Sequence, residues 1–257
     1  MILTQPIQPQ YKEAGDGPLV LFLHGLGGNR HAFDRQIERM KADYHCVAWD
    51  VPGYGGSTPA KHLTFEVLSD CLNTLLAVLE KTPYAVVGHS LGGMVAQTWV
   101  SRGGICEKLV LAQTTPRFGK PGSTFNEEFL SARLKPIEQG STPADFAQKL
   151  IASMFHDTSK QGEIEAAIAT MAPLPASVYK QAIECLVTFD ELSNLPNINC
   201  DTLCLAAEFD TTASPKAVQK MADAIQGACY QCLSDAGHLA YLEQADAFTN
   251  AISNFLE

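Results

Sequence analysis

The stretch Val86-Val87-Gly88-His89-Ser90-Leu91-Gly92-Gly93 decides the fold of this 257-residue chain. An apolar run, Tyr84 to Val87, enters a Gly-x-Ser-x-Gly pentapeptide, and a helix-like stretch, Met94 to Val100, leaves it. The pattern predicts a strand, a sharp turn with a serine at its apex, and a helix. Glycines are needed where side chains would collide in such a turn. The strain would hold the hydroxyl of Ser90 out from the sheet edge.

Two later residues stand where partners of Ser90 are expected. The apolar run 203–207 indicates a strand, and Asp210 follows its C-terminal end, where open parallel sheets place their active sites. His238 follows a second strand-like run, 230–233. Because a serine hydroxyl is a poor nucleophile near neutral pH, we expect His238 to take its proton. Asp210 would hold the imidazole in the required tautomer.

Simpler interpretations exist for each of these residues. Ser90 could be a turn serine and His238 a core histidine, although the flanking strand, helix and glycines favour the chemical interpretation. Glu208 and Asp190 are alternative acids, and Asp235 is close to His238 in sequence. His89 precedes the serine, so its side chain is expected on the sheet side of the turn, in a structural role.

A glycine-rich segment is expected to complete the chemistry. The buried-strand pattern 19–23 ends in His24-Gly25-Leu26-Gly27-Gly28. Acyl transfer passes through an oxyanion, which needs fixed N–H donors. We expect one donor to be the amide of Leu91, directly after the serine, and the other the amide of Leu26. The simpler interpretation of these glycines is an ordinary turn.

With these motifs, the chain resembles the α/β-hydrolase family. The resemblance covers nearly the whole chain, and it rests on His24-Gly25, the loop from Asp50 to Ser57, the turn from Gly88 to Gly92, Asp210 with Pro215, Gly237-His238, and the tail from Leu242 to Leu256. Overall length, lid length and the C-terminal block are most similar to small carboxylesterases and 3-oxoadipate enol-lactonases. Many relatives have proline where Ala245 stands, which does not affect the chemistry.

Alternating apolar runs and helical patterns favour an α/β fold, a mostly parallel sheet flanked by helices. Strand-like runs lie near 19–23, 44–49, 84–88, 108–112, 203–207 and 229–233, and helix-like segments near 31–41, 64–80, 92–101, 215–226 and 244–256. The stretch Ile7 to Glu13 could add an antiparallel edge strand. We therefore expect a core domain made of residues 1–115 and 196–257.

Residues 116–195 interrupt this alternation and predict a helical cap over the active site. Their helical patterns lie near 125–137, 143–155, 164–171 and 176–189, and prolines and glycines, Pro136 among them, separate them. Caps exclude water and shape substrate sites. The alternative is that these helices belong to the core.

The cap is where substrate choice is expected to be decided. Six apolar residues of the cap are candidates for the wall of the substrate pocket: Met154, Phe155, Met171, Leu174, Val178 and Phe189. The cap also offers Arg117, Arg133 and Lys135, any of which would suit a carboxylate-bearing substrate if it faced the pocket. The simpler interpretation of these three is that they face solvent.

The sequence predicts a serine hydrolase that cleaves a small carboxylic ester or lactone through an acyl-enzyme on Ser90. Neither a cofactor nor a metal is expected, and no His/Cys cluster has zinc-ligand spacing. One alternative is a hydrolase of carbon–carbon bonds in ring-cleavage products, which uses the same three residues. An alternative from another class is a non-catalytic ligand-binding protein of this fold.

Composition limits the partners. The formal net charge is −10, which disfavours binding to nucleic acid. No apolar run approaches the roughly 20 residues of a membrane span, and the first ten residues lack a secretory pattern. Since several of the eight cysteines fall inside apolar patterns, we expect reduced thiols and a cytoplasmic protein whose partner is a small molecule. The oligomeric state is left open.

Overall fold

One twisted sheet forms the centre of the molecule. The structure is a computed structural model that describes residue 7, residues 9–120 and residues 122–257. Within these residues, seven strands pair in the order β1-β3-β2-β4-β5-β6-β7. Their bounds are Tyr11–Ala14 (β1), Leu19–Leu23 (β2), His45–Trp49 (β3), Ala85–His89 (β4), Lys108–Ala112 (β5), Asp201–Ala207 (β6) and Cys229–Leu233 (β7).

All pairings are parallel except that of β1, which runs antiparallel to β3 at the edge. Strands β2, β3 and β4 are buried along their whole length, which explains their continuous apolar sequences. The expected edge strand is present but begins at Tyr11. Gln8, which belongs to the stretch proposed for it, lies outside the described residues.

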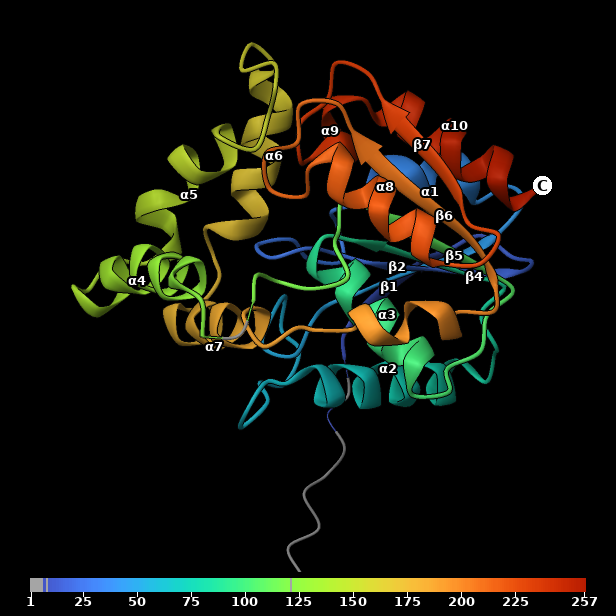
Figure 1. The fold of residues 1–257 in the computed structure, drawn as a ribbon, viewed down its shortest axis with the longest axis horizontal. Helices are drawn as coiled ribbons and strands as arrows, with labels where there is room; N and C mark the ends of the chain where they lie inside the picture. The colour runs from blue at the N-terminus through green and yellow to red at the C-terminus, as the bar shows by residue number, and fades with distance from the viewer. Residues whose placement is uncertain (1–6, 8, 121) are drawn as a thin grey trace, which may run out of the picture.

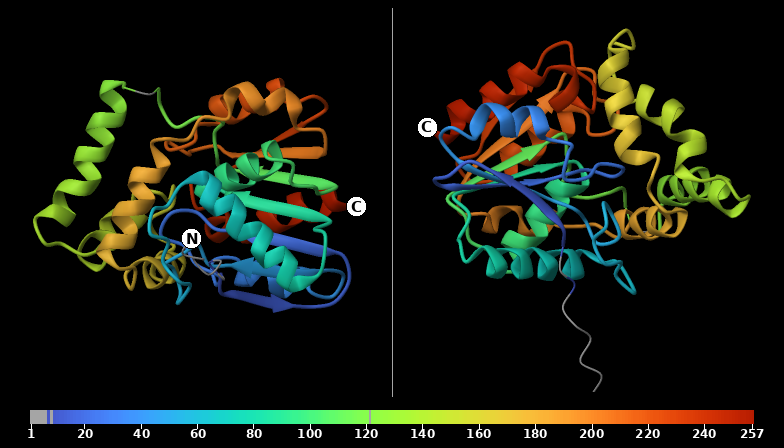
Figure 2. Two further views of the ribbon diagram at one scale, coloured as in Figure 1. Left: turned by 90° about the horizontal axis from the view of Figure 1, so that it is seen from below. Right: turned by 180° about the vertical axis from the view of Figure 1, so that it is seen from behind.

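Helices cover both faces of the sheet (Figure 1). On one face lie α2, α3, the short 3-10 helix η1 and α8, and on the other lie α1 and α10, as the two further views also show (Figure 2). The bounds are Asp34–Met40 (α1), Phe65–Leu79 (α2), Leu91–Ser101 (α3), Leu192–Asn197 (η1), Pro215–Ala224 (α8), Ala240–Glu243 (α9) and Ala245–Leu256 (α10). The sequence patterns had not predicted η1 and α9, because elements of four to six residues are too short for periodicity to show.

A group of helices between β5 and β6 forms the cap, beside the sheet in Figures 1 and 2. These helices are Thr124–Glu138 (α4), Pro143–Ala152 (α5), Gln161–Met171 (α6) and Ala176–Leu186 (α7). The predicted α/β fold with a helical cap is therefore confirmed. The predicted boundaries of cap and core remain a prediction.

One detail of the cap differs from expectation. Pro136 was expected to break a helical pattern, but it lies inside α4. Proline removes one backbone donor and clashes with the preceding turn, so it tends to kink or end a helix. Here α4 ends two residues later, and the N–H groups of Gln139 and Gly140 bond the carbonyls of Lys135 and Ile137.

A short antiparallel neck joins the cap to the core. The N–H of Phe118 donates to the carbonyl of Phe189 at 3.0 Å, and that of Glu191 donates to Pro116 at 2.8 Å. Arg117 and Asp190 form an isolated bridge between them. No strand pairing was expected in residues 116–195, because two residues on each side are too few to show alternation. Among the described helices, none combines the length and apolarity needed to cross a bilayer.

Candidate active site

Ser90 sits on a strained turn between β4 and α3. Its backbone has φ 52° and ψ −118°, a conformation that side chains rarely adopt. Close packing of the turn explains why glycine follows it. A Cβ on Gly92 would lie 2.0 Å from the carbonyl oxygen of Leu23, at the end of the neighbouring β2. The N–H of Ser90 donates to Ala112 on β5 at 3.0 Å, which fixes the turn against the sheet.

Three side chains form a hydrogen-bonded chain at this turn. Asp210 Oδ2 accepts a hydrogen bond from His238 Nδ1 at 2.8 Å, and His238 Nε2 lies 2.9 Å from Ser90 Oγ. Because Nδ1 carries the proton that bonds the carboxylate, Nε2 is free to accept the serine proton. The structure thus brings together the three residues that the sequence singled out, and the arrangement can activate a serine hydroxyl.

The carboxylate of Asp210 is held from its other side as well. Its Oδ1 accepts the N–H groups of Thr212 at 2.7 Å and Ala213 at 2.9 Å, and the side chain is fully buried. A buried carboxylate is tolerated when its lone pairs are filled in this way. These bonds leave Oδ2 directed at His238, so the acid has one orientation.

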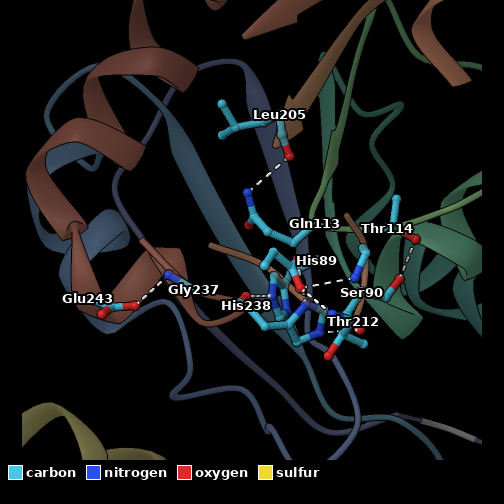
Figure 3. A network of polar contacts seen from close by, with 11 residues as sticks. His89, Ser90, Gln113, Thr114, Leu205, Thr212, Gly237, His238 and Glu243 are labelled. Atoms are coloured by element: carbon cyan, nitrogen blue, oxygen red, sulfur yellow. Dashed lines mark hydrogen bonds and ion pairs between the residues drawn. The ribbon is translucent and has the colours of Figure 1, made fainter. Parts of the chain in front are cut away.

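His89 has a larger part in the site than the sequence suggested. Its Nε2–H donates to the main-chain carbonyl of His238 at 2.8 Å, and the two rings lie 5.0 Å apart (Figure 3). Burial, and then the neighbouring His238, lower the pKa of His89 to about 3, so the ring stays neutral. His89 therefore supports the backbone of the candidate base. Its sequence position beside the serine could not show this, because the contact spans 149 residues.

The glycine-rich loop after β2 lies against Ser90. A Cβ on Gly25 would be 2.9 Å from His89 Nδ1 and 3.1 Å from the Cβ of Ser90. The carbonyl of Gly25 bonds His24 Nδ1 at 2.8 Å and the N–H of Gly28 at 3.0 Å. In a trans peptide the N–H points opposite to the carbonyl, so these bonds also orient the amide of Leu26.

The second expected donor, Leu91, is the first residue of α3. The first N–H groups of a helix have no partner within the helix and carry partial positive charge. Within the described residues, the amides of Leu26 and Leu91 donate to no other group. Both are available for an oxyanion beside Ser90.

The alternative acids lie elsewhere. Glu208 Oε2 accepts the N–H of Asp235 at 3.2 Å on the exposed surface, and Asp190 lies in the neck, 3.9 Å from Arg117. Within the described residues, none of these carboxylates bonds His238.

A mostly apolar cavity opens at Ser90 between core and cap. The residues that line it come from the loop after β2, from the turn, from the end of β5, from the cap and from the two later loops: Leu26, His89, Ser90, Met94, Gln113, Thr114, Thr115, Phe118, Phe129, Arg133, Leu150, Met154, Leu186, Thr212, Ala213, His238 and Leu239. Of the apolar wall candidates in the cap, Met154 lies here, while the others are buried among the core and cap helices. An apolar cavity with few polar groups is typical of a small-molecule site.

The three cationic side chains of the cap that were candidates for substrate binding lie in different parts of the structure. Arg133 lines the cavity, with its guanidinium 5.5 Å from the ring centroid of Phe129. Arg117 lies in the neck beside Asp190, and Lys135 lines separate grooves on the outer side of α4. Neither contributes to the walls of the cavity described above.

Sequence reasoning missed the polar residues directly after β5. Thr114 Oγ1 donates to the carbonyl of Ser90 at 2.8 Å, and the amide of Gln113 bonds the carbonyl of Leu205 at 2.9 Å (Figure 3). Both line the cavity. The signal was present in the sequence, because they follow the C-terminal end of a buried parallel strand.

The fold and this site define a hydrolase of the α/β type. A family model described as the alpha/beta hydrolase family matches residues 20–251, and the chain belongs to this family. Over 255 residues it is 27% identical to a pimeloyl-[acyl-carrier protein] methyl ester esterase of Chromobacterium violaceum, covering 95% of this chain and 96% of that protein.

Two further similarities confirm the narrower resemblance. The chain is 24% identical over 245 residues to 3-oxoadipate enol-lactonase 1 of Acinetobacter baylyi, covering 94% of this chain and 90% of that protein. A solved structure of a thermophilic esterase from Thermogutta terrifontis superposes with a TM-score of 0.88 at 25% identity, covering 97% of this chain and 93% of that one.

Proposed function

We propose that this protein hydrolyses a small carboxylic ester or lactone through an acyl-enzyme on Ser90. The observation that carries the proposal is the hydrogen-bonded chain from Asp210 through His238 to Ser90, of which His238 and Ser90 line an apolar cavity. The esterase and enol-lactonase relatives support the same class of substrate.

The geometry supports a two-step route. Ser90 Oγ attacks the ester carbonyl while His238 Nε2 takes its proton, and the N–H groups of Leu26 and Leu91 stabilise the oxyanion. Asp210 stabilises the imidazolium that this transfer forms, and the imidazolium then gives the proton to the departing alkoxide. Water, activated by His238, attacks the acyl-enzyme and releases the acid and the free serine. A lactone follows the same steps, with its own hydroxyl as leaving group.

The position of Arg133 supports a finer proposal, a substrate with an anionic group. Arg133 is the cation on the cavity wall, and the contact that its guanidinium makes within the described residues is with the ring of Phe129. Arg133 is half-buried and also lines a neighbouring groove of the cap. A guanidinium at the wall of a largely apolar cavity favours a carboxylate because the two planar groups can form paired, charge-assisted hydrogen bonds. A lactone or ester whose acyl part ends in a carboxylate would fit.

Replacement of the serine tests the proposal. We expect Ser90→Ala to lower turnover of a short-chain p-nitrophenyl ester about a million-fold while the fold is unchanged. A serine-directed phosphonate should label the wild type at Ser90 and leave the variant unlabelled. If the folded variant kept more than a few percent of the wild-type rate, Ser90 would not be the nucleophile.

The wild-type protein, assayed with an ester, a ring-cleavage diketone and the phosphonate, distinguishes the proposed function from its two alternatives. Turnover of short esters without turnover of a ring-cleavage diketone favours the proposal over carbon–carbon bond hydrolysis. A wild-type protein that neither reacts with the phosphonate nor turns over any ester would be a ligand-binding member of the fold.

A further inference from the structure

The cap segment after α5 touches both loops that carry the candidate acid and base. The carbonyl of Met154 accepts the main-chain N–H of His238 at 2.7 Å. The ring of His156 stacks on Phe209, directly before Asp210, with centroids 3.6 Å apart and planes at 7°. The cap is therefore in direct contact with the catalytic loops of the core.

The contact leaves no room for a side chain at Gly237, the residue before His238. A Cβ on Gly237 would lie 2.4 Å from the carbonyl oxygen of Met154 and 2.8 Å from the nitrogen of His156. Backbone thus packs on backbone at this point. A shift of the cap segment is therefore transmitted to the loop that carries His238.

Glu243, the last residue of α9, joins these two segments. Its side chain is buried, with 1% of the residue exposed. Oε2 accepts the N–H of Gly237 at 2.7 Å, and Oε1 accepts the N–H of Asp157 at 2.5 Å (Figure 3 shows the bond to Gly237). Lys160, also in the cap, bonds the main-chain carbonyl of Glu243. One carboxylate thus holds an N–H of the histidine loop and an N–H of the cap at a fixed separation.

We propose that Glu243 is a positioning residue that couples the placement of the cap to the orientation of His238. The inference rests on the proposed function, in which His238 is the base. A buried carboxylate is costly unless both oxygens are satisfied, so the junction is complete only when cap and histidine loop are both in place. Docking of the cap and alignment of the base are then one event.

The substrate cavity supplies the reason for such a coupling. Leu150 and Met154 line the cavity, and they lie on the same segment, just before the residues that contact the two loops. A substrate that packs against this wall holds the segment in the position that aligns His238. The cap therefore acts on the chemical step as well as on the choice of substrate.

Glu243→Gln tests the coupling with little change of shape. The amide keeps one acceptor oxygen, but its NH₂ group cannot accept the second N–H. His238 keeps its bonds to Asp210 and to His89, so the loop stays near its place but is less precisely held. Because small misplacements of a catalytic group cost up to about 100-fold, we expect kcat to fall about 10- to 100-fold and KM for a small neutral ester to change less than about twofold.

The matched control is Glu163→Gln. Glu163 on α6 pairs with Arg35 on α1 at 3.1 Å, so this change also breaks a contact between cap and core but touches neither catalytic loop. Its kcat should equal that of the wild type. The rate of phosphonate labelling at Ser90 should fall in Glu243→Gln in proportion to kcat and stay unchanged in Glu163→Gln. The proton NMR signal of the His238 Nδ1–H should move only in Glu243→Gln.

Several outcomes would overturn the inference. A folded Glu243→Gln variant with wild-type kcat, even at a lower melting temperature, gives the residue a structural role alone. Equal losses in both variants indicate general docking of the cap. If Glu243→Gln does not fold, His156→Ala removes the exposed stack on Phe209 instead, and wild-type kcat there overturns the coupling. If Ser90→Ala kept its activity, the proposed function itself would be refuted. If Ser90→Ala were inactive and Glu243→Gln had wild-type kcat, only the coupling through Glu243 would be refuted.

Discussion

Replacing Asp210 with asparagine changes one atom of the hydrogen-bonded chain and should stop the reaction without unfolding the protein. Oδ1 of the carboxylate accepts hydrogen bonds from two main-chain N–H groups, and Oδ2 accepts one from His238 Nδ1. An asparagine can place its single oxygen on only one of these sides. The neighbours therefore decide which way the amide faces.

The count of donors favours one orientation. With its oxygen toward Thr212 and Ala213, the amide keeps two hydrogen bonds, and its NH₂ group faces His238 Nδ1. The reverse orientation leaves two buried N–H donors without an acceptor, at a cost of about 1–3 kcal/mol each. In the favoured orientation Nδ1 must accept, so the proton moves to Nε2, and the imidazole cannot take the proton of Ser90.

The expected loss follows from this wrong tautomer. Asp-to-Asn changes of this kind lower turnover about ten-thousand-fold, which is about 5.5 kcal/mol of activation free energy. The assay is kcat on a short-chain p-nitrophenyl ester, with melting temperature and circular dichroism to show that the variant is folded.

Matched amides at the other acids are the control. Asp190→Asn, Asp235→Asn and Glu208→Gln should each cost far less, because none of these carboxylates bonds the imidazole. A folded Asp210→Asn variant that lost less than about 100-fold would refute the tautomer argument. A larger loss at one of the other three would reassign the acid.

Three further changes test the site and its supports. Arg133→Ala should lose about 2–3 kcal/mol of transition-state stabilisation on an anionic lactone and little on a neutral ester. Lys135→Ala, on the outer side of α4, should leave kcat/KM unchanged on both substrates. If Arg133→Ala lost equally on both substrates, Arg133 would have a structural role. Gly92→Ala should lower the free energy of unfolding, measured in urea, by about 1–3 kcal/mol or more, because the added Cβ would lie 2.0 Å from the carbonyl oxygen of Leu23. Gly162→Ala, which has open space around it, should not lower it. Equal effects would contradict the packing argument. Because the pKa of His89 is lowered to about 3 in the folded protein, the unfolded chain binds more protons below about pH 6.5. The free energy of unfolding should therefore fall by about 2.5 kcal/mol as the pH falls from 7 to 4.5. His89→Gln should remove this part of the pH dependence, and an unchanged dependence would show that His89 is not its cause.

Local patterns in the sequence predicted most of the fold. The strand patterns match β2 to β7 to within about two residues. Strands β2 to β6 could be recognised because buried parallel strands are continuous apolar runs bounded by turn residues. The turn at Ser90 and the loop at Gly25 were predictable for the same kind of reason, since close backbone packing there admits only glycine. Pro136, η1 and α9 were not, because short elements and helix ends depend on neighbouring segments.

The sequence by itself determined the α/β-hydrolase fold, the cap, and the three side chains that form the hydrogen-bonded chain. The three side chains could be predicted because each lies in the segment that follows a strand, and parallel strands end at one edge of the sheet. The sequence could not rank Arg117, Arg133 and Lys135, whose local surroundings are alike until the cap is folded onto the core.

Only the tertiary structure decided how the site is held together. The bonds that fix the site join residues far apart in the chain, 148 positions for Ser90 and His238 and 86 for Asp157 and Glu243. The direction of such a bond depends on the docking of whole helices, and no local period in the sequence encodes it. For that reason the composition of the site was predictable, while its supports, His89 within the core and Glu243 between core and cap, became visible only in the folded structure.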